Sequence, residues 1–486
     1  MRDTCFFNEA IVCLCIGQGV HFHRSFFYPE AVLLNRNHPF IHHHHDLMTE
    51  TTEKKYSFPK LFWIANSTEL LERAAFYSVA SFIVIYLNET LGFEPTFATF
   101  LNGSLLWGLI YFLPPLSGTL ADKFGFRGGL LLAFVTLAIG YFLMGNVQMF
   151  GSAGHYELPI VIAIVIIGIG GSFVKPCISG TVQKNNMGKA TLAFGIFYMV
   201  INIGSLIGRI ISYFIRTSFG IPSIFWIAVV ACALGGVLVF VAYHEKYSHV
   251  SAQPAKETRS LSKALKDMVL ALGNLRFLFF LIVMAGFWSM YVQIYNLIPL
   301  YLRHFIDKDA AVELYTIANP IMIVAFQLLV TKFSQKFSAI RSIVYGMVFA
   351  AIGMCVNIIP IYFFIGNTTL YFGVLPISGI FMLIAIASVA VGEMLAAPRM
   401  YEYIGAIAPK GQEGLFLGYA NLPMAIGTLA GGPLGGFLFV KVAKDMQNPT
   451  LLWLLVACMS AFSVAGLIVY NYFITRSASR SAASAA

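Results

Sequence analysis

The feature that most constrains this chain is a series of about twelve apolar runs, each long enough to cross a lipid bilayer as one helix. Such a crossing takes about 20 residues, because the hydrocarbon core is about 30 Å thick and a helix rises about 1.5 Å per residue. Helices are expected because open strands cannot satisfy their backbone hydrogen bonds in lipid. We predict spans at residues 61–87, 97–120, 129–147, 158–182, 192–215, 221–243, 277–302, 314–333, 343–365, 372–397, 415–440 and 451–474.

The composition supports the membrane assignment. The chain is 58% hydrophobic and 11% charged, with a mean hydropathy of +0.77, whereas soluble domains carry about 25% charged residues. We therefore predict an all-α membrane protein. The glycines at 427–436 are expected to let neighbouring helices pack closely.

The positions of the basic residues predict the orientation, because short cytoplasmic loops are enriched in lysine and arginine. If the first helix leaves the cytoplasm, most basic residues lie inside, and the outer loops hold only Arg216, Arg303, Lys308, Lys441 and Lys444. We therefore expect a multi-pass protein of the cell inner (plasma) membrane with both termini cytoplasmic. The net charge of +9 reflects this asymmetry, and nucleic-acid binding is not expected.

The longest polar interruption divides the predicted helices into two sets of six. We expect a bundle at 60–243, a cytoplasmic linker at 244–276, a second bundle at 277–475 and a cytoplasmic tail at 476–486. The linker contains apolar residues at helical spacing from Leu261 to Leu272, with lysines between them. This pattern predicts an amphipathic helix along the inner membrane surface.

Residues 1–59 are expected to form a cytoplasmic N-terminal extension. Within it, residues 1–47 contain an apolar stretch too short to span and a histidine run, "HPFIHHHHDL". Histidines of this kind could bind a metal, but no second ligand cluster supports such a site, so no metal is predicted. The polar stretch that begins at Met48 leads directly into the first helix, and we expect the native protein to start there.

A few charged residues lie within the predicted spans. A lone charge at mid-membrane costs ~2.5–3.5 kcal/mol, so such residues persist where they pair or line water. The acids are Glu69, Glu72 and Glu393, and the cations are Arg73, Lys175 and the less certain Arg209, in the outer half of its helix.

Glu69, Glu72 and Arg73 share one helix face because they are spaced by three and four residues. That face should look into the bundle, either as a purely structural ion pair or as part of a functional site. Lys175 and Glu393 stand alone, one in each half, and each is the simplest partner for the other. With Arg209 left out, three carboxylates face two cations, and the excess carboxylate is a place for a proton.

Several motifs together resemble the proton-dependent oligopeptide transporter family of the major facilitator superfamily. The stretch "ELLERAAFY" at 69–77 resembles its E-x-x-E-R-F-x-Y-Y signature, and "YFLPPLSGTLADKFGFR" at 111–127 resembles the superfamily loop between helices 2 and 3. Further resemblances are "KPC" at 175–177, "FGIFYMVINIGSL" at 194–206, "FW" with Gln293, "ANP" at 318–320, and Glu393 with Pro398.

The resemblance implies two pseudo-symmetric six-helix bundles that rock around a central site. It implies a proton-coupled symporter that imports di- and tripeptides by alternating access, with no enzymatic activity, and with the proton gradient in place of any cofactor. Its partners would be short peptides, protons and the bilayer, and we expect a monomer. The residues implied in proton coupling are Glu69, Glu72, Arg73, Lys175 and Glu393.

The resemblance also implies a site for a zwitterion. Arg73 and Lys175 would hold the peptide carboxylate, and Glu393 would hold the amino group. Trp288 would wall a side-chain pocket, and neutral hydrogen bonds would come from Tyr77, Tyr111, Asn202, Gln293 and Asn319.

The chain departs from the family pattern at the outer gate. Ala80 stands where many members have an arginine, and Val292 where many have an acid. We predict that these two residues face each other and close the outer gate by apolar packing, without an ion pair. Asp122 and Arg127 of the loop motif are the other predicted gating residues.

Two alternatives remain open. The same fold could carry another small zwitterion or organic anion. A membrane-embedded enzyme would need a nucleophile with a base, or a metal cluster, within the spans, and neither pattern is present in the sequence.

Overall fold

A computed structural model gives the fold of the chain. It describes residues 58–151, 155–187, 189–244, 266, 270, 272–363, 371–372, 375–407 and 419–483. Nearly all of the predicted N-terminal extension lies outside these ranges. So do most of the predicted linker and most of its predicted amphipathic helix at 261–272.

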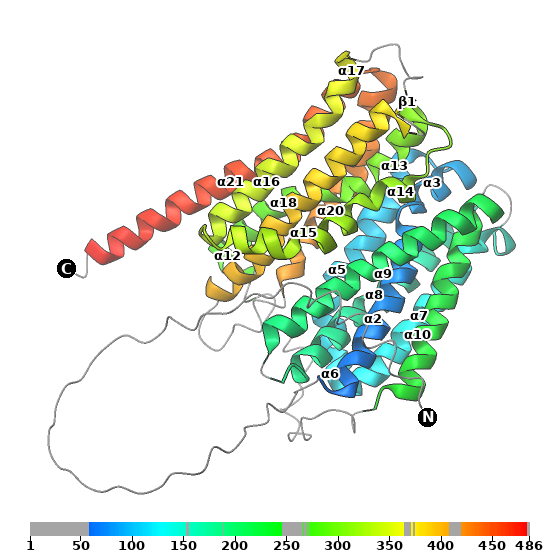
Figure 1. Cartoon of the computed structure of the whole chain (residues 1–486), viewed down its shortest axis with the longest axis horizontal. Helices are drawn as coiled ribbons and strands as arrows, with labels where there is room; N and C mark the ends of the chain where they lie inside the picture. Colours follow the sequence, from blue (N-terminus) through cyan, green and yellow to red (C-terminus); the bar gives the residue numbers. More distant parts are fainter. Residues whose placement is uncertain are drawn as a thin grey trace, which may run out of the picture. The chain divides into compact units, whose positions relative to one another are not determined.

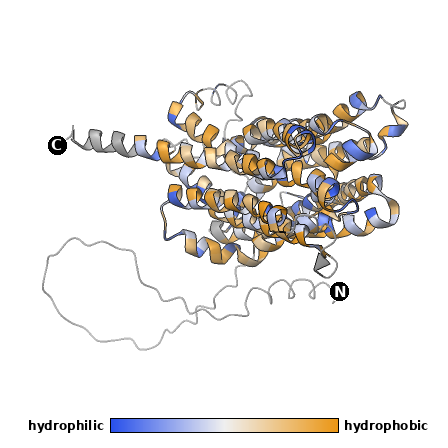
Figure 2. Ribbon diagram, turned by 90° about the horizontal axis from the view of Figure 1, so that it is seen from above, coloured by the Kyte–Doolittle hydropathy of each residue, from blue (hydrophilic) through white to orange (hydrophobic). Residues whose placement is uncertain are grey.

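Twelve helical segments of the described chain are long and apolar enough to cross a membrane, which confirms the predicted number. The first runs from Lys60 to Thr90 and the last from Pro449 to Phe473. Hydrophobic residues cover most of the helical ribbon (Figure 2). The chain is therefore a multi-pass membrane protein.

The first six spans are built from α-helices that often continue into a turn of wider π or tighter 3₁₀ geometry. Their elements are α2 (Lys60–Ala80), α3 (Ile83–Ile85), η1 (Tyr86–Thr90), α4 (Pro95–Thr99), η2 (Phe100–Trp107), α5 (Gly108–Phe112), α6 (Pro114–Phe124), α7 (Phe126–Gly145), η3 (Val147–Met149), α8 (Glu157–Lys184), α9 (Ala190–Phe219), η4 (Ile221–Ser223) and α10 (Ile224–Ala242).

The last six spans follow the same plan. Their elements are α12 (Leu275–Tyr291), η6 (Val292–Ile294), α13 (Leu297–Tyr301), η7 (Leu302–Ile306), α14 (Val312–Thr316), α15 (Ala318–Ser334), α16 (Ala339–Cys355), η8 (Val356–Ile358), α17 (Ile359–Phe363), α18 (Ile377–Ile407), η9 (Tyr419–Asn421), α20 (Leu422–Phe437), η10 (Leu438–Asp445) and α21 (Pro449–Ala483).

One short antiparallel sheet departs from the predicted all-helical pattern. Strands β1 (Tyr371–Phe372) and β2 (Leu375–Pro376) pair immediately before α18. The tenth span therefore begins at Ile377, whereas the sequence predicted a helix from Phe372. Pro376 explains the difference, because a proline disfavours helical backbone in the residue that precedes it.

Helices of the same half pack against one another. In the first half α7 contacts α8 and α10, and α2 contacts α9; in the second half α16 contacts α18 and α21, and α12 contacts α20. The two groups are visible in Figure 1 as helices coloured blue to green and green to red.

Contacts between the halves include those of η2 with α20 and those of α9 with α14 and α15. Glycines allow the first of these. A Cβ atom at Gly103 of η2 would lie 2.6 Å from the Cα of Gly432 in α20, so the two backbones touch. Within the second half, a Cβ atom at Gly427 would lie 2.5 Å from the carbonyl oxygen of Ala285. The predicted packing role of this glycine cluster is confirmed.

Candidate substrate and proton site

The three charged residues of α2 form one buried cluster. Exposed fractions are 0% for Glu69, 2% for Glu72 and 3% for Arg73. Arg73 forms an ion pair with Glu72, and its Nε lies 3.4 Å from Oε1 of Glu69. Neither carboxylate oxygen of Glu69 has a hydrogen-bond partner in the structure. The prediction that this helix face looks inward is confirmed, and one arginine serves two acids.

Lys175 lies on α8 and is half-buried. Its ammonium nitrogen lies 4.9 Å from the ring centroid of Tyr111, which α5 provides. This is the geometry of a cation–π contact. Tyr111 is thus a direct neighbour of the Lys175 ammonium group.

Glu393 provides the acid of the second half. It is half-buried on α18 and accepts a hydrogen bond of 3.0 Å from Nδ2 of Asn319 on α15. Tyr291 is a second hydrogen-bond partner. No ion pair joins Lys175 to Glu393 in the described part of the structure. Asn319 and Tyr291, rather than Lys175, are therefore the direct partners of Glu393.

Two other predicted binding residues, Asn202 and Trp288, differ in their hydrogen bonds. Asn202 donates to the carbonyl of Tyr198 on its own helix at 2.9 Å. The indole Nε1 of Trp288 is buried and has no hydrogen-bond partner, and its ring packs edge-on against Tyr291. Trp288 and Tyr291 therefore place an aromatic wall beside Glu393.

Gln293 does not take the predicted substrate-facing position. It is fully buried, and its amide nitrogen donates to the carbonyls of Ser289 and Gly431, both at 2.8 Å. A Cβ atom added to Gly435 would lie only 2.1 Å from the amide oxygen of Gln293. The side chain fills the gap that the glycines of α20 leave, so in this structure it joins two helices.

Arg209 is buried more deeply than the sequence interpretation expected. This α9 residue is 0% exposed, and its Nε donates to Oγ1 of Thr316 at 3.1 Å. Its Nη2 donates to the hydroxyl of Tyr295 at 3.0 Å, and Nη1 bonds Ser205. Its guanidinium carbon lies 4.5 Å from the ring centroid of Tyr77. The signal was available, because Arg209 lies seven residues before Arg216 and therefore on the same helix face.

Arg209 changes the count of interior charges. Without Arg209, three carboxylates were predicted to face two cations. With Arg209 buried, Glu69, Glu72 and Glu393 face Arg73, Lys175 and Arg209. The overall excess of acid disappears. A local excess remains on α2, where two carboxylates share one arginine.

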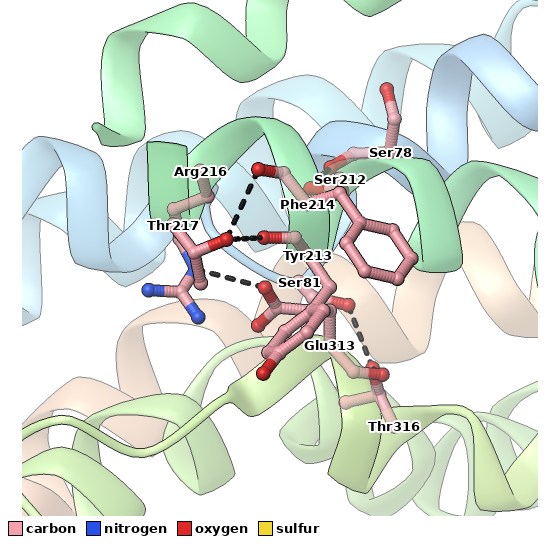
Figure 3. A network of polar contacts seen from close by, with 9 residues as sticks. All are labelled: Ser78, Ser81, Ser212, Tyr213, Phe214, Arg216, Thr217, Glu313 and Thr316. Atoms are coloured by element: carbon pink, nitrogen blue, oxygen red, sulfur yellow. Dashed lines mark hydrogen bonds and ion pairs between the residues drawn. The ribbon is translucent and has the colours of Figure 1, made fainter. Parts of the chain in front are cut away.

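In the predicted orientation, the outer end of the bundle is the end at which η1, α9 and η7 finish and α14 begins. Two ion pairs join the halves there. Arg216 of α9 bonds Glu313 of α14 with an Nε to Oε1 distance of 2.8 Å, and Figure 3 shows the two side chains facing each other. Arg303 of η7 bonds Glu89 of η1, also at 2.8 Å. The prediction that the outer gate contains no ion pair is therefore wrong.

Ala80 and Val292 are both fully buried. Ser81, next to Ala80, contacts Thr316 of α14 through hydroxyls 2.8 Å apart. Val292 packs against Gly431 of its own half. A Cβ atom added to Gly431 would lie only 2.9 Å from Cγ1 of Val292. The first span therefore contacts α14 next to Ala80, through Ser81. The ion pairs between the halves are made by Arg216 with Glu313 and by Arg303 with Glu89.

The loop motif between the second and third spans binds within its own half. Arg127 donates to the carbonyl of Phe240 at 2.7 Å, and its guanidinium lies over the Phe240 ring. Asp122 belongs to α6, and its side chain lies outside the described part of the structure. Gly125 ends α6 with a φ of 80°, a backbone conformation that favours glycine.

Comparisons with known proteins identify the superfamily to which the chain belongs. The model of the Major Facilitator Superfamily matches residues 68–372. The chain belongs to this superfamily. It is 29% identical over 187 residues to dipeptide and tripeptide permease A of Enterobacter sp. (strain 638), covering 38% of this chain and 35% of that one.

A second curated relative is dipeptide and tripeptide permease B of Shigella dysenteriae serotype 1 (strain Sd197). It is 30% identical over 216 residues, which cover 43% of this chain and 42% of that one. The chain thus matches about two-fifths of the length of these relatives.

Solved structures of the proton-dependent oligopeptide transporter (POT) family share the fold. The transporter PepTSo has a TM-score of 0.69 at 17% identity and covers 87% of this chain and 99% of its own. A POT transporter in complex with 5-aminolevulinic acid has a TM-score of 0.69 at 18% identity, covering 86% and 97%. The resemblance drawn from the motifs is confirmed. These relatives are transporters rather than enzymes.

Proposed function

We propose that the chain is a proton-coupled symporter that imports di- and tripeptides by alternating access. The observation that carries the proposal is the buried cluster of α2, in which Arg73 is shared by Glu69 and Glu72. The relatives named as dipeptide and tripeptide permeases supply the substrate class.

The charges are suited to a zwitterion. Arg73 and Lys175 in the first half would bind the peptide carboxylate, and Glu393 in the second half would bind the ammonium group. Charge-assisted hydrogen bonds of this kind are about twice as strong as neutral ones. A peptide bound in this way connects both halves, so its presence can favour a change in their arrangement.

Arg73 offers a route to proton coupling. While it is bonded to Glu72 and close to Glu69, a substrate carboxylate competes with these acids for the same guanidinium. A proton on either acid removes that competitor and frees Arg73 for the substrate. Release of the proton restores the ion pairs and expels the substrate carboxylate. Tyr77, Tyr111, Asn202 and Asn319 would add neutral hydrogen bonds, and Trp288 would contact the peptide side chains.

We also propose a location, an orientation and an energy source for the protein. The protein would lie in the inner (plasma) membrane with both termini in the cytoplasm, and it would work as a monomer. The proton gradient would be its energy source, without a bound cofactor or nucleic acid. Asp122 and Arg127 would act at the inner gate.

A second candidate is another small zwitterion. The POT family transporter described above was solved in complex with 5-aminolevulinic acid, which also has an ammonium group and a carboxylate. The charges described above would bind both ends of such a molecule in the same way. Competition by 5-aminolevulinic acid against dialanine uptake separates a peptide-selective site from a general zwitterion site.

Uptake of labelled dialanine into proteoliposomes tests the proposal. A proton gradient directed inward, with the lower pH outside, should drive accumulation of dialanine. An uncoupler should abolish this accumulation while counterflow of dialanine continues. Liposomes without protein are the control for leakage. Accumulation that is indifferent to the uncoupler would refute proton coupling, and absence of counterflow would refute the substrate class.

A further inference from the structure

Arg209 combines complete burial with an unusual set of partners. In the described part of the structure, Arg209 donates hydrogen bonds to the hydroxyls of Thr316, Tyr295 and Ser205 and to the Ser205 carbonyl. The rings of Tyr77 and Tyr295 lie beside the guanidinium. All of these groups are neutral, whereas a buried charge without an opposite charge is costly. The arrangement therefore leaves Arg209 able to gain from an anion.

The partners of Arg209 also join the two halves. Arg209 and Ser205 belong to α9, but Thr316 ends α14 and Tyr295 follows η6. Thr316 also contacts Ser81 of the first half through its hydroxyl. An acceptor that displaced Thr316 and Tyr295 from Arg209 would thus remove direct contacts between the halves.

Tyr77 connects Arg209 with the acidic cluster. The ring centroid of Tyr77 lies 4.5 Å from the guanidinium carbon of Arg209 and 6.0 Å from that of Arg73. Arg209 lies 19 residues along α9 from the cytoplasmic start of that helix at Ala190, toward the outer end. An anion that enters from that end would meet Arg209 before Arg73.

We propose that Arg209 is the entry receptor for the substrate carboxylate. Without substrate it holds the halves together through Thr316 and Tyr295. An incoming carboxylate replaces these neutral acceptors, because charge-assisted bonds to a guanidinium are stronger, and the outer end loosens. The carboxylate then passes along the Tyr77 ring to Arg73. This inference rests on the proposed peptide substrate.

Spin-label distances across the outer end test the inference. Labels at Ser218→Cys of α9 and Lys308→Cys before α14 use two exposed positions, one in each half. The seven native cysteines are replaced by alanine. Dialanine and dialanine amide serve as probes, since the amide keeps the ammonium group but has no carboxylate. In the parent protein, dialanine should widen the outer end at about tenfold lower concentration than the amide does.

Substitutions at Arg209 should change this difference. Arg209→Gln should raise the dialanine midpoint about tenfold, to that of the amide, and Arg209→Lys should recover part of the loss. Arg216→Gln is the matched control on the same helix face. It should alter the resting distance distribution but keep the ratio between acid and amide.

Tyr295→Phe gives an independent test should Arg209→Gln fail to fold. It removes one neutral acceptor and keeps the arginine, so the dialanine midpoint should fall. An unchanged or higher midpoint in Tyr295→Phe, or an unchanged ratio between acid and amide in Arg209→Gln, overturns the inference and leaves the proposed function intact. If dialanine does not widen the outer end of the parent protein, the inference is overturned. If the parent protein also shows neither uptake nor counterflow of dialanine, the proposed function fails too.

Discussion

The ion pair between Arg216 and Glu313 should control how often the outer end opens. The Glu313 side chain is 1% exposed and that of Arg216 is 12% exposed. Removal of one partner from a buried pair costs about 3–5 kcal/mol. At about 1.4 kcal/mol per factor of ten, the lower limit corresponds to a shift on the order of a hundredfold. Glu313→Gln should therefore move the outer end strongly toward its open arrangement.

The second outer ion pair provides a matched control. The Glu89 side chain is 35% exposed and that of its partner Arg303 is 14% exposed, so water and salt screen this pair. Exposed pairs contribute about 0.2–1 kcal/mol, which corresponds to a factor of about five or less. Glu89→Gln makes the same chemical change as Glu313→Gln at the same end of the bundle, with a much smaller expected effect.

Distance measurements between the labels described above provide the assay. The open fraction is measured for the parent, Glu313→Gln, Glu89→Gln, Arg216→Gln and the double variant of Arg216 and Glu313. The double variant should be less open than the sum of the two single effects, because the removed groups interact. Equal effects of Glu313→Gln and Glu89→Gln, or strict additivity in the cycle, would refute the argument from burial.

Three further predictions concern the site and the packing. Glu69→Gln should abolish accumulation of dialanine driven by a pH gradient but preserve counterflow, and loss of both in a folded protein would contradict its assignment to proton coupling. Glu393→Gln should raise the KM for dialanine at least about tenfold with less effect for N-acetylated dialanine, and equal effects on both would exclude an ammonium contact. Gly432→Ala should lower the free energy of unfolding by about 1–3 kcal/mol, because its Cβ would lie 2.8 Å from the Thr99 carbonyl oxygen. The control Gly195→Ala, whose Cβ would meet nothing within 4 Å, should not destabilise; thermal unfolding in detergent measures both.

The sequence alone determined the features that depend on short stretches of chain. Each span needs only about 20 apolar residues, so all twelve could be counted before any helix was placed. The inward face of Glu69, Glu72 and Arg73 followed from helical periodicity, since residues three and four apart are neighbours. Close packing at the glycines followed from the missing side chains. In each case the interaction is set within one helix turn or one helix.

Tertiary structure decided the features that depend on how distant segments meet. Arg216 and Glu313 are 97 residues apart, Arg209 and Thr316 are 107 apart, and Arg303 and Glu89 are 214 apart. No local pattern specifies such pairs, because each side chain could reach several partners until the two sets of helices pack. The same packing gave Gln293 a place against the glycines of α20. The charges of the predicted outer gate therefore lie on α9, α14, η1 and η7. Helical periodicity could show which face of each helix carries a charge, but only the packing of the two halves determined which residue it would pair with.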